Sequence, residues 1–215
     1  MARPDALSKE RIVEVAMEIL DAAGEGALTF RALGARLATG SGAIYWHVAD
    51  KDELLAACTS DVITRVMAGV GATAAPRAAI RAVALGVFDA IDAHPWVGTQ
   101  LSREPWASPV LQIFEGIGGR LQALGVPRRA RFNAASALVN YILGLAGQYA
   151  AGARLLPRGT RRTAFLGAVA ARWAALDPAA YPFVRQVAPQ LRDHDDREQF
   201  LAGIDLILAG IRTLR

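Results

Sequence analysis

The sequence lacks the features of a secreted, membrane-spanning or disulfide-bonded protein. Cys58 is the only cysteine in 215 residues, which excludes an internal disulfide and a multi-cysteine zinc site. No stretch reaches eighteen uninterrupted apolar residues, so we expect no membrane span. No hydrophobic secretion segment follows the opening residues Met-Ala-Arg-Pro-Asp. These absences favour a globular protein of the reducing cytoplasm.

Strand patterns and enzyme motifs are also missing. The three histidines show no His-x-x-x-His spacing, and the glycines of residues 116–119 lie in a helical pattern with no preceding strand. The acidic residues around His194 precede a predicted helix and fit a solvated capping segment. We therefore expect no catalytic residue, no metal site and no cofactor. A helical enzyme is the least favoured alternative.

Net charge does not reveal a nucleic-acid-binding region. The whole chain carries +4, but residues 1–70 hold seven Arg/Lys and ten Asp/Glu, a formal balance of −3. Residues 71–215 hold seventeen Arg/Lys and ten Asp/Glu, a formal balance of +7. Since phosphate contacts depend on a few well-placed cations and amides, the local arrangement of residues must decide the question.

What the sequence does have is helical periodicity along nearly its whole length. Alanine, the best helix former, dominates the apolar residues. In residues 1–68 we expect four helices, with caps at Ser8, Thr29 and Asp50, and with Glu53 completing a capping box. Small residues and Pro76 after residue 69 mark a domain boundary. Further helices are predicted at about 76–93, 109–124, 127–153, 161–175 and 196–213, with a short piece near 179–191.

Residues 28–51 form the most informative segment. Two short helices joined by a three- to four-residue turn make a helix-turn-helix, whose second helix enters the major groove of DNA. Small residues at 41–43 would allow that helix to approach bases and phosphates closely, and the rings at 45–47 offer hydrogen bonds on its outer face. Lys51 offers a charge and free amides to a phosphate at the next helix start.

In this segment the chain resembles the TetR family of transcriptional regulators. The matching positions are Leu28-Thr29, Arg31, Leu33, Leu37, Gly42, Ile44-Tyr45-Trp46-His47-Val48, Lys51 and Leu54-Leu55. The Tyr-Trp-His-Val form is closest to the tetracycline repressor branch. The resemblance covers residues 8–66, and residues 200–211 resemble the last helix of that branch.

The resemblance implies an all-α fold with a helix-turn-helix domain at 1–50, a linking helix at 51–68 and a helical effector-binding and dimerisation domain at 69–215. By position, Thr29, Tyr45, His47 and Lys51 correspond to phosphate-contacting residues. The residues that read or approach bases are Arg31, Ser41, Gly42 and Ala43, with Trp46 packing on or contacting the DNA backbone. One departure is that Ala38-Thr39-Gly40 replaces the usual Gly-Val-Ser turn. Either Gly40 or Ser41 therefore caps the recognition helix.

The resemblance also implies a homodimer held by a four-helix bundle, and two helices of the sequence suit it. One carries Ala134, Ala135, Leu138, Val139, Ile142, Leu143 and Ala146, and the other carries Phe200, Ile204, Ile207, Leu208 and Ile211. Packing of both helices within one protomer is the alternative. A two-fold dimer places two recognition helices roughly 34–36 Å apart on a palindromic operator of double-stranded DNA.

For the effector we expect a small molecule in the helical body. Candidate pocket residues, chosen as aromatic and polar groups near the expected cavity, are Phe88, His94, Trp96, Gln100, Trp106, Phe114, Asn140, Tyr141 and Gln148. Gln100 takes the place of the magnesium-binding histidine of the tetracycline repressor, which favours an apolar or aromatic effector. The expected function is a cytoplasmic, ligand-released transcriptional repressor. An activator or a ligand-independent regulator with the same head is the alternative.

Overall fold

Helices make up the whole ordered secondary structure of the described part of the chain. The computed structural model describes residues 7–71, 75–103, 108–155, 161–192 and 194–214. The first part of the chain contains α1 (Lys9–Ala23), the 3-10 helix η1 (Glu25–Ala27), α2 (Phe30–Arg36), α3 (Ser41–Tyr45) and α4 (Lys51–Gly69). The second part contains α5 (Pro76–Ala93), α6 (Pro95–Arg103), α7 (Ser108–Ala123), α8 (Arg128–Leu155), α9 (Arg162–Ala174), α10 (Pro182–Val187), the 3-10 helix η2 (Ala188–Leu191) and α11 (Asp196–Arg212).

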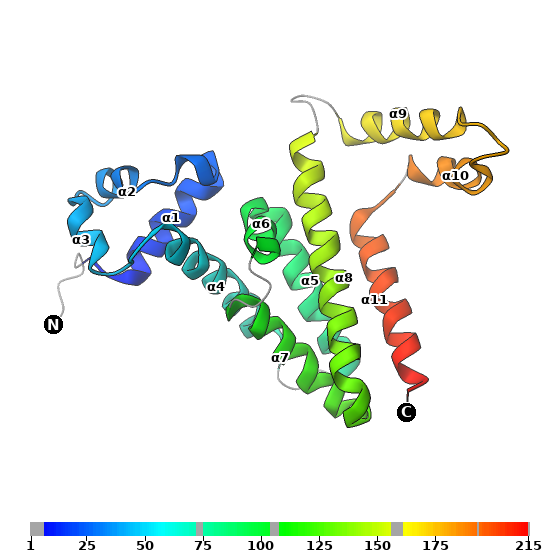
Figure 1. Ribbon diagram of the computed structural model, residues 1–215, viewed down its shortest axis with the longest axis horizontal. Coiled ribbons are helices and arrows are strands. Elements are labelled where there is room, and N and C mark those ends of the chain that lie inside the picture. Colours follow the sequence, from blue (N-terminus) through cyan, green and yellow to red (C-terminus); the bar gives the residue numbers. More distant parts are fainter. Residues whose placement is uncertain (1–6, 72–74, 104–107, 156–160, 193, 215) are drawn as a thin grey trace.

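The molecule has two parts that α4 joins (Figure 1). We call α1, η1, α2 and α3 the head, and α5 to α11 the body. The head lies at one end of the view, and α4 runs from it into the body helices. The expected all-α fold, with a helix-turn-helix head and a larger helical body, is confirmed.

The predicted caps form in the head. The Ser8 hydroxyl accepts a hydrogen bond from the Arg11 amide at 3.2 Å, and Thr29 Oγ1 accepts from the Ala32 amide at 3.1 Å. Asp50 Oδ1 accepts from the Glu53 amide at 2.8 Å. The Glu53 carboxylate reaches one residue further back than a capping box requires and accepts from the Ala49 amide at 2.7 Å.

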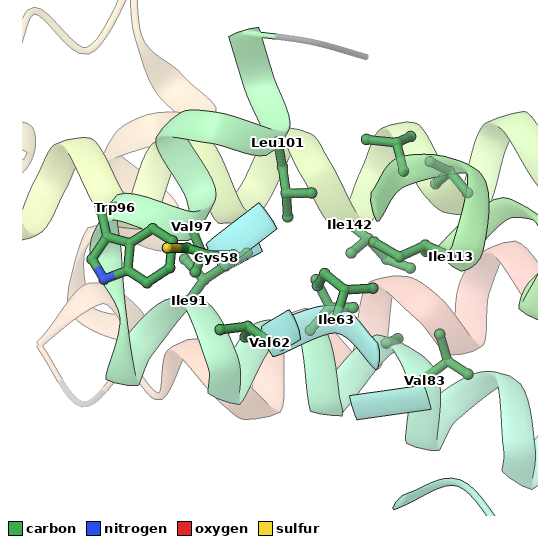
Figure 2. Close-up of a cluster of buried hydrophobic side chains, with 14 of the residues drawn as sticks. Cys58, Val62, Ile63, Val83, Ile91, Trp96, Val97, Leu101, Ile113 and Ile142 are labelled. Carbon is green, nitrogen blue, oxygen red and sulfur yellow. The ribbon is translucent and has the colours of Figure 1, made fainter. Parts of the chain in front are cut away.

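The buried side chains of α4 belong to the head and to the body at once. Leu54, Leu55 and Cys58 are each at most 1% exposed, and the Cys58 thiol lies 3.8 Å from the Val13 carbonyl oxygen of α1. Figure 2 shows Cys58 and Ile63 of α4 in one buried cluster with body residues such as Trp96 of α6. The hydrophobic core is therefore continuous from α1 through α4 to the body.

The sequence pattern predicted α5, α7, α8, α9 and α11 within two residues of their observed ends but missed α6 and η1. The sequence pattern predicts no helix between residue 93 and residue 109. In the structure, His94 ends α5 and Pro95 begins a new nine-residue helix, because proline's missing amide is not needed in a first turn. The apolar residues of this helix extend over too few positions to show a clear helical repeat.

The helices α9, α10 and η2 form an arm that packs mainly on itself. In Figure 1 the arm extends from the upper end of α8 to beyond α11. Arg185 of α10 closes the C-terminal end of α9 by donating to the carbonyl oxygens of Ala174 and Leu176. The arm is thus a peripheral part of the body, and the ion pair between Arg162 of α9 and Asp196 joins it to α11.

Candidate DNA-binding surface and its connection to the body

The start of α3 resolves which residue caps the helix. Gly40 is the N-cap, in an extended conformation and without a side-chain hydrogen bond. Ser41 is the first residue of α3, and its side chain and Gly42 are exposed. The Ser41 hydroxyl is therefore not used as a cap and remains available to an external partner.

The turn between α2 and α3 is unusually tight. Ala38 has a positive φ of 51°, a left-handed conformation that glycine adopts without strain. The Thr39 amide donates to the Gly34 carbonyl oxygen at 2.9 Å, which closes the turn on α2. A Cβ atom on Gly34 would lie 2.7 Å from the Thr39 carbonyl oxygen, so Gly34 is required for this close approach.

Two aromatic residues at the end of α3 face outward. Trp46 is 90% exposed, the most exposed large apolar side chain in the described residues, and Tyr45 is 54% exposed. The Tyr45 ring is stacked on Phe30 of α2, with centroids 4.3 Å apart. Ile44 and Val48, by contrast, are buried and anchor the helix. The surface around α3 thus presents rings to the outside while its inner side is held rigidly.

The cations near this surface differ in their partners. Arg31 is exposed and has no ion-pair or hydrogen-bond partner among the described residues. Arg36 is paired with Glu18 at 3.4 Å. Lys51 Nζ donates to the Glu25 carbonyl oxygen at 2.7 Å, which leaves its charge unneutralised. Arg31 and Lys51 are therefore the cations in this region that an anionic partner could reach without breaking an ion pair.

Two of the ten carboxylates of residues 1–70 contact the body. Asp21 at the end of α1 and Glu25 of η1 bind side chains of α6 and of His94, which precedes it. Asp21 Oδ1 lies 2.7 Å from both His94 Nδ1 and Trp96 Nε1. Arg103 Nη1 donates to both Glu25 oxygens at 2.9 Å. These two charges therefore belong to the junction between the head and the body.

The predicted DNA-binding residues come together on one part of the head. They comprise the exposed Thr29 and Arg31 at the start of α2, Ser41, Gly42 and Ala43 at the start of α3, Tyr45, Trp46 and His47 at its end, and Lys51 at the start of α4. Ala43, His47 and Lys51 are half-buried and the others are exposed. Their roles as DNA contacts remain predictions, which the geometry supports.

Among the described residues, the predicted effector residues have several different surroundings. His94, Trp96 and Gln100 lie at the junction with the head, where Gln100 donates to Glu25 at 3.3 Å. Of the remaining candidates, Phe88 and Tyr141 pack against Phe200, Phe114 packs against Phe132, Asn140 and Gln148 are exposed, and Trp106 lies outside the described residues.

A small cavity lies between α4, α6 and α7, and of the effector candidates it includes only Gln100. Its volume is about 10 Å³, which is room for about one water molecule. Its lining residues are Asp52, Ala56, Thr59, Gln100, Leu101, Pro109 and Val110.

Two side chains, one in α4 and one in α8, have pKa values raised by their surroundings. Burial raises the pKa of the Cys58 thiol to about 12, so this thiol is unreactive at neutral pH. Burial also raises the pKa of Tyr141, whose hydroxyl donates to the Phe200 carbonyl oxygen at 3.3 Å. Neither group has the geometry of a reaction centre.

No helix in the described segments is long and apolar enough to cross a membrane, and within those segments no three metal-binding side chains cluster.

Sequence reasoning missed the head–body contacts of Asp21 and Glu25. Both residues follow the ordinary pattern of solvated charges at the end of a helix, and their partners lie more than seventy residues away in the chain. The signal that could have suggested them is the excess of carboxylates in the head together with the excess of Arg in the body.

A head with a rigid helix-turn-helix, exposed rings and reachable cations, joined by a shared helix to a separate helical body, defines a DNA-binding regulator. The comparisons with known proteins agree. Residues 12–58 match the bacterial regulatory proteins of the tetR family, and residues 75–215 match the tetracyclin repressor-like C-terminal domain. The chain belongs to the TetR family. Members of this family are transcriptional regulators and not enzymes.

Individual relatives support this assignment. The solved structure of the transcriptional regulator SCO7222, a TetR from Streptomyces coelicolor, is 53% identical, has a TM-score of 0.88 and matches 97% of this chain and 99% of that chain. ActR from the same organism, crystallised with actinorhodin, is 22% identical with a TM-score of 0.78, over 97% of this chain and 98% of its own. A curated HTH-type transcriptional regulator from Saccharopolyspora erythraea is 32% identical over 64% of this chain, and the match spans 59% of that relative's length.

Proposed function

We propose that the chain is a cytoplasmic repressor that binds a palindromic operator as a homodimer and releases it when a small molecule binds the body. The observation that carries this proposal is the surface around α3. Trp46, 90% exposed, and its neighbour Tyr45, 54% exposed, place two large rings side by side on the outside of the head, and grouped exposed apolar surface marks an interaction site. Rings, small residues and the cations Arg31 and Lys51 on one side of a rigid helix suit the major groove and its phosphates.

The dimer is supported by the outer faces of α8 and α11, which correct our choice of interface residues. Most of the apolar residues predicted for the interface, such as Leu138 and Ile204, are buried within one protomer. The opposite faces carry exposed residues that are mostly small or apolar: Ala137, Gly144 and the polar Asn140 on α8, and Ala202, Leu206, Ala209 and Gly210 on α11. Leu206 is 74% exposed, and small residues beside it permit close helix packing.

Leu206→Asp tests this interface, because a charge there would be buried without a partner in a dimer. We expect a dimer for the wild-type protein and a folded monomer for the variant in sedimentation equilibrium. Leu111→Asp, which changes another exposed leucine on α7, is the control and should remain dimeric. A dimeric Leu206→Asp variant would refute the proposed interface.

Release by a ligand follows from the shared core of α4. Because α4 packs against both α1 and α6, a ligand that displaces body helices moves the head as well. It can release DNA only through different affinities for the two arrangements. The same fold accommodates small molecules in ActR, which has been crystallised with actinorhodin and with (S)-DNPA. For this chain we expect an apolar or aromatic effector.

Selection from random double-stranded DNA, followed by sequencing, tests the DNA-binding part directly. We expect an inverted repeat whose half-site centres lie about one helical turn, roughly 34–36 Å, apart. Enrichment of no sequence, or of an unrepeated site, would contradict a two-headed repressor. An activator is distinguished by a reporter under the selected site, whose expression should rise in cells that lack the protein if it represses.

A further inference from the structure

The contacts between the head and the body are concentrated on two carboxylates. Asp21, at the last turn of α1, lies 2.7 Å from both His94 Nδ1 and Trp96 Nε1 at the start of α6. Glu25, in η1, accepts from Arg103 at the end of α6 and from Gln100 one turn earlier. The head is therefore attached to both ends of the same nine-residue helix.

The Asp21 contact provides the hydrogen-bond acceptor for the indole N–H of Trp96. Trp96 is only 4% exposed, and a largely buried indole N–H is normally hydrogen-bonded in a folded protein. Asp21 Oδ1 supplies that acceptor from the other domain. Rotation of the head away from α6 would break this bond and the Asp21–His94 contact together.

The Glu25 contact continues to the DNA-binding surface. The carbonyl oxygen of Glu25 accepts a hydrogen bond from Lys51 Nζ at 2.7 Å, while its carboxylate accepts two bonds from Arg103. A single residue thus joins the end of α6 to a cation that we predict contacts phosphate. Lys51 has two further N–H donors for that phosphate.

From this arrangement we infer that Asp21 and Glu25 are positioning residues that set the orientation of the head on α6 and thereby the separation of the two heads in the dimer. The inference rests on the proposed dimeric repressor. Neither residue needs to touch DNA. Each acts by restricting the head to one orientation before DNA binds, so that less conformational freedom is lost on the operator.

A positioning role predicts a result that a purely structural role does not. A full palindrome requires both heads at one spacing, whereas a duplex with a single half-site requires only one correctly folded head. A variant that weakens the contacts between the head and α6 should bind the full palindrome less tightly. Its affinity for the half-site duplex should not change. Damage to the folding of the head would weaken both.

The experiment measures affinities of the full-length dimer for the selected palindrome and for a duplex with one half-site, by fluorescence anisotropy. For Asp21→Ala, which removes the acceptor of Trp96, and for Glu25→Gln we expect about tenfold weaker binding to the palindrome and a change below about twofold on the half-site duplex. Glu14→Gln, which breaks the exposed Arg11–Glu14 pair within α1, is the matched control and should change neither affinity.

A double-mutant cycle tests whether the Glu25–Arg103 pair acts as a unit. Arg103→Gln should weaken palindrome binding about as much as Glu25→Gln, and the double variant should lose no more than either single variant. Equal losses on both DNAs, unchanged palindrome affinity, or additive losses would overturn the inference. If the wild-type protein bound no palindrome at all, the proposed function would fail instead, before the role of the junction came into question.

Discussion

The predicted binding residues of the head and those of the body have different surroundings. In the head, the predicted DNA contacts lie together, and Trp46 and Arg31 have their exposed groups turned away from the protein. In the body, the predicted effector residues mostly bind other parts of the protein, as Trp96 binds Asp21 and as Phe88 packs on Phe200. Exposed groups without internal partners indicate a binding surface, whereas aromatic and polar residues in a helical body more often satisfy one another.

This difference shows that residue type is a better guide to a DNA-binding surface than to a cavity for a small molecule. DNA has one repeating shape, so a surface that reads it needs residues in a set order on a short segment. A cavity for a small molecule can be lined from any combination of helices, so no such order is required. The following predictions test whether the body aromatics are structural and whether the head's tight turn serves its surface.

The largest expected effect belongs to Phe200→Ala. Phe200 is 1% exposed and lies between Phe88 and Tyr141, with ring centroids at 5.0 and 5.7 Å. Removal of its ring should lower the free energy of unfolding by about 3–5 kcal/mol, as measured by urea denaturation. Phe183→Ala removes a ring that is 69% exposed on the arm and should change stability by less than about 0.5 kcal/mol. A small effect at Phe200 would show that these rings line an open site.

Gly34→Ala is next in size. The added Cβ would lie 2.7 Å from the Thr39 carbonyl oxygen. Because this oxygen belongs to the backbone, it cannot move aside as a side chain could, and the turn would have to open. We expect a loss of about 1–2 kcal/mol in stability, with weaker DNA binding, since the turn orients α3. Gly42→Ala adds a Cβ in open space and serves as the stability control. Thermal denaturation of both variants makes the comparison, and equal midpoints would refute the role of Gly34.

A smaller effect is expected from Asp205→Asn, which breaks the ion pairs that hold α11 to α5. Arg81 first, and Arg77 second, lower the pKa of Asp205. Its side chain is about one third exposed, so solvent screening limits the loss to about 0.5–1 kcal/mol at pH 7.

The pH dependence of this effect has a definite sign. Because the folded pKa of Asp205 lies below the unfolded value of about 3.9, its contribution is complete well above pH 4. The contribution disappears as the pH falls through the folded pKa. Denaturation at pH 7 and near pH 3 should therefore show the wild-type advantage shrinking in acid. An advantage that grew in acid would contradict the assignment.

Ala38→Gly should produce the smallest change, and a stabilising one. Ala38 has a φ of 51°, which costs a residue with a Cβ about 1–2 kcal/mol. The greater freedom of glycine in the unfolded chain offsets part of this gain, so we expect a net increase of about 0.5 kcal/mol. Differential scanning calorimetry should show a slightly higher midpoint. A lower midpoint would indicate that the alanine methyl contributes packing that outweighs the strain.

Much of the fold could be predicted from the sequence because local signals determine it. Ser8, Thr29 and Asp50 cap their helices as expected, since a cap depends only on residues three positions away. The apolar periods of α5 and α11 predicted their ends well. The short helix α6 escaped detection because nine residues beginning with Pro95 provide too little periodicity.

The less predictable features depend on distant parts of the chain. Glu25 and Arg103 form their pair across 78 positions, and no local pattern marks either residue. The same applies to the interface faces of α8 and α11: periodicity located the apolar stripe, but the protomer uses that stripe for its own core. The predicted DNA-binding residues form one surface because a short segment carries nearly all of them, whereas the described effector candidates are spread over the four helices α5 to α8 and the residue His94 between two of them.

The affinity of a Trp46→Ala variant for the selected palindrome tests the central claim most directly. Trp46 is 90% exposed and contributes little to the folded protomer, so its removal should change the free energy of unfolding by less than about 0.5 kcal/mol. If the surface around α3 binds DNA, we expect at least about tenfold weaker binding, or about 1.4 kcal/mol. Leu111→Ala, a comparable change on the body, should bind as the wild type does. A Trp46→Ala variant that bound the palindrome with wild-type affinity would contradict the account.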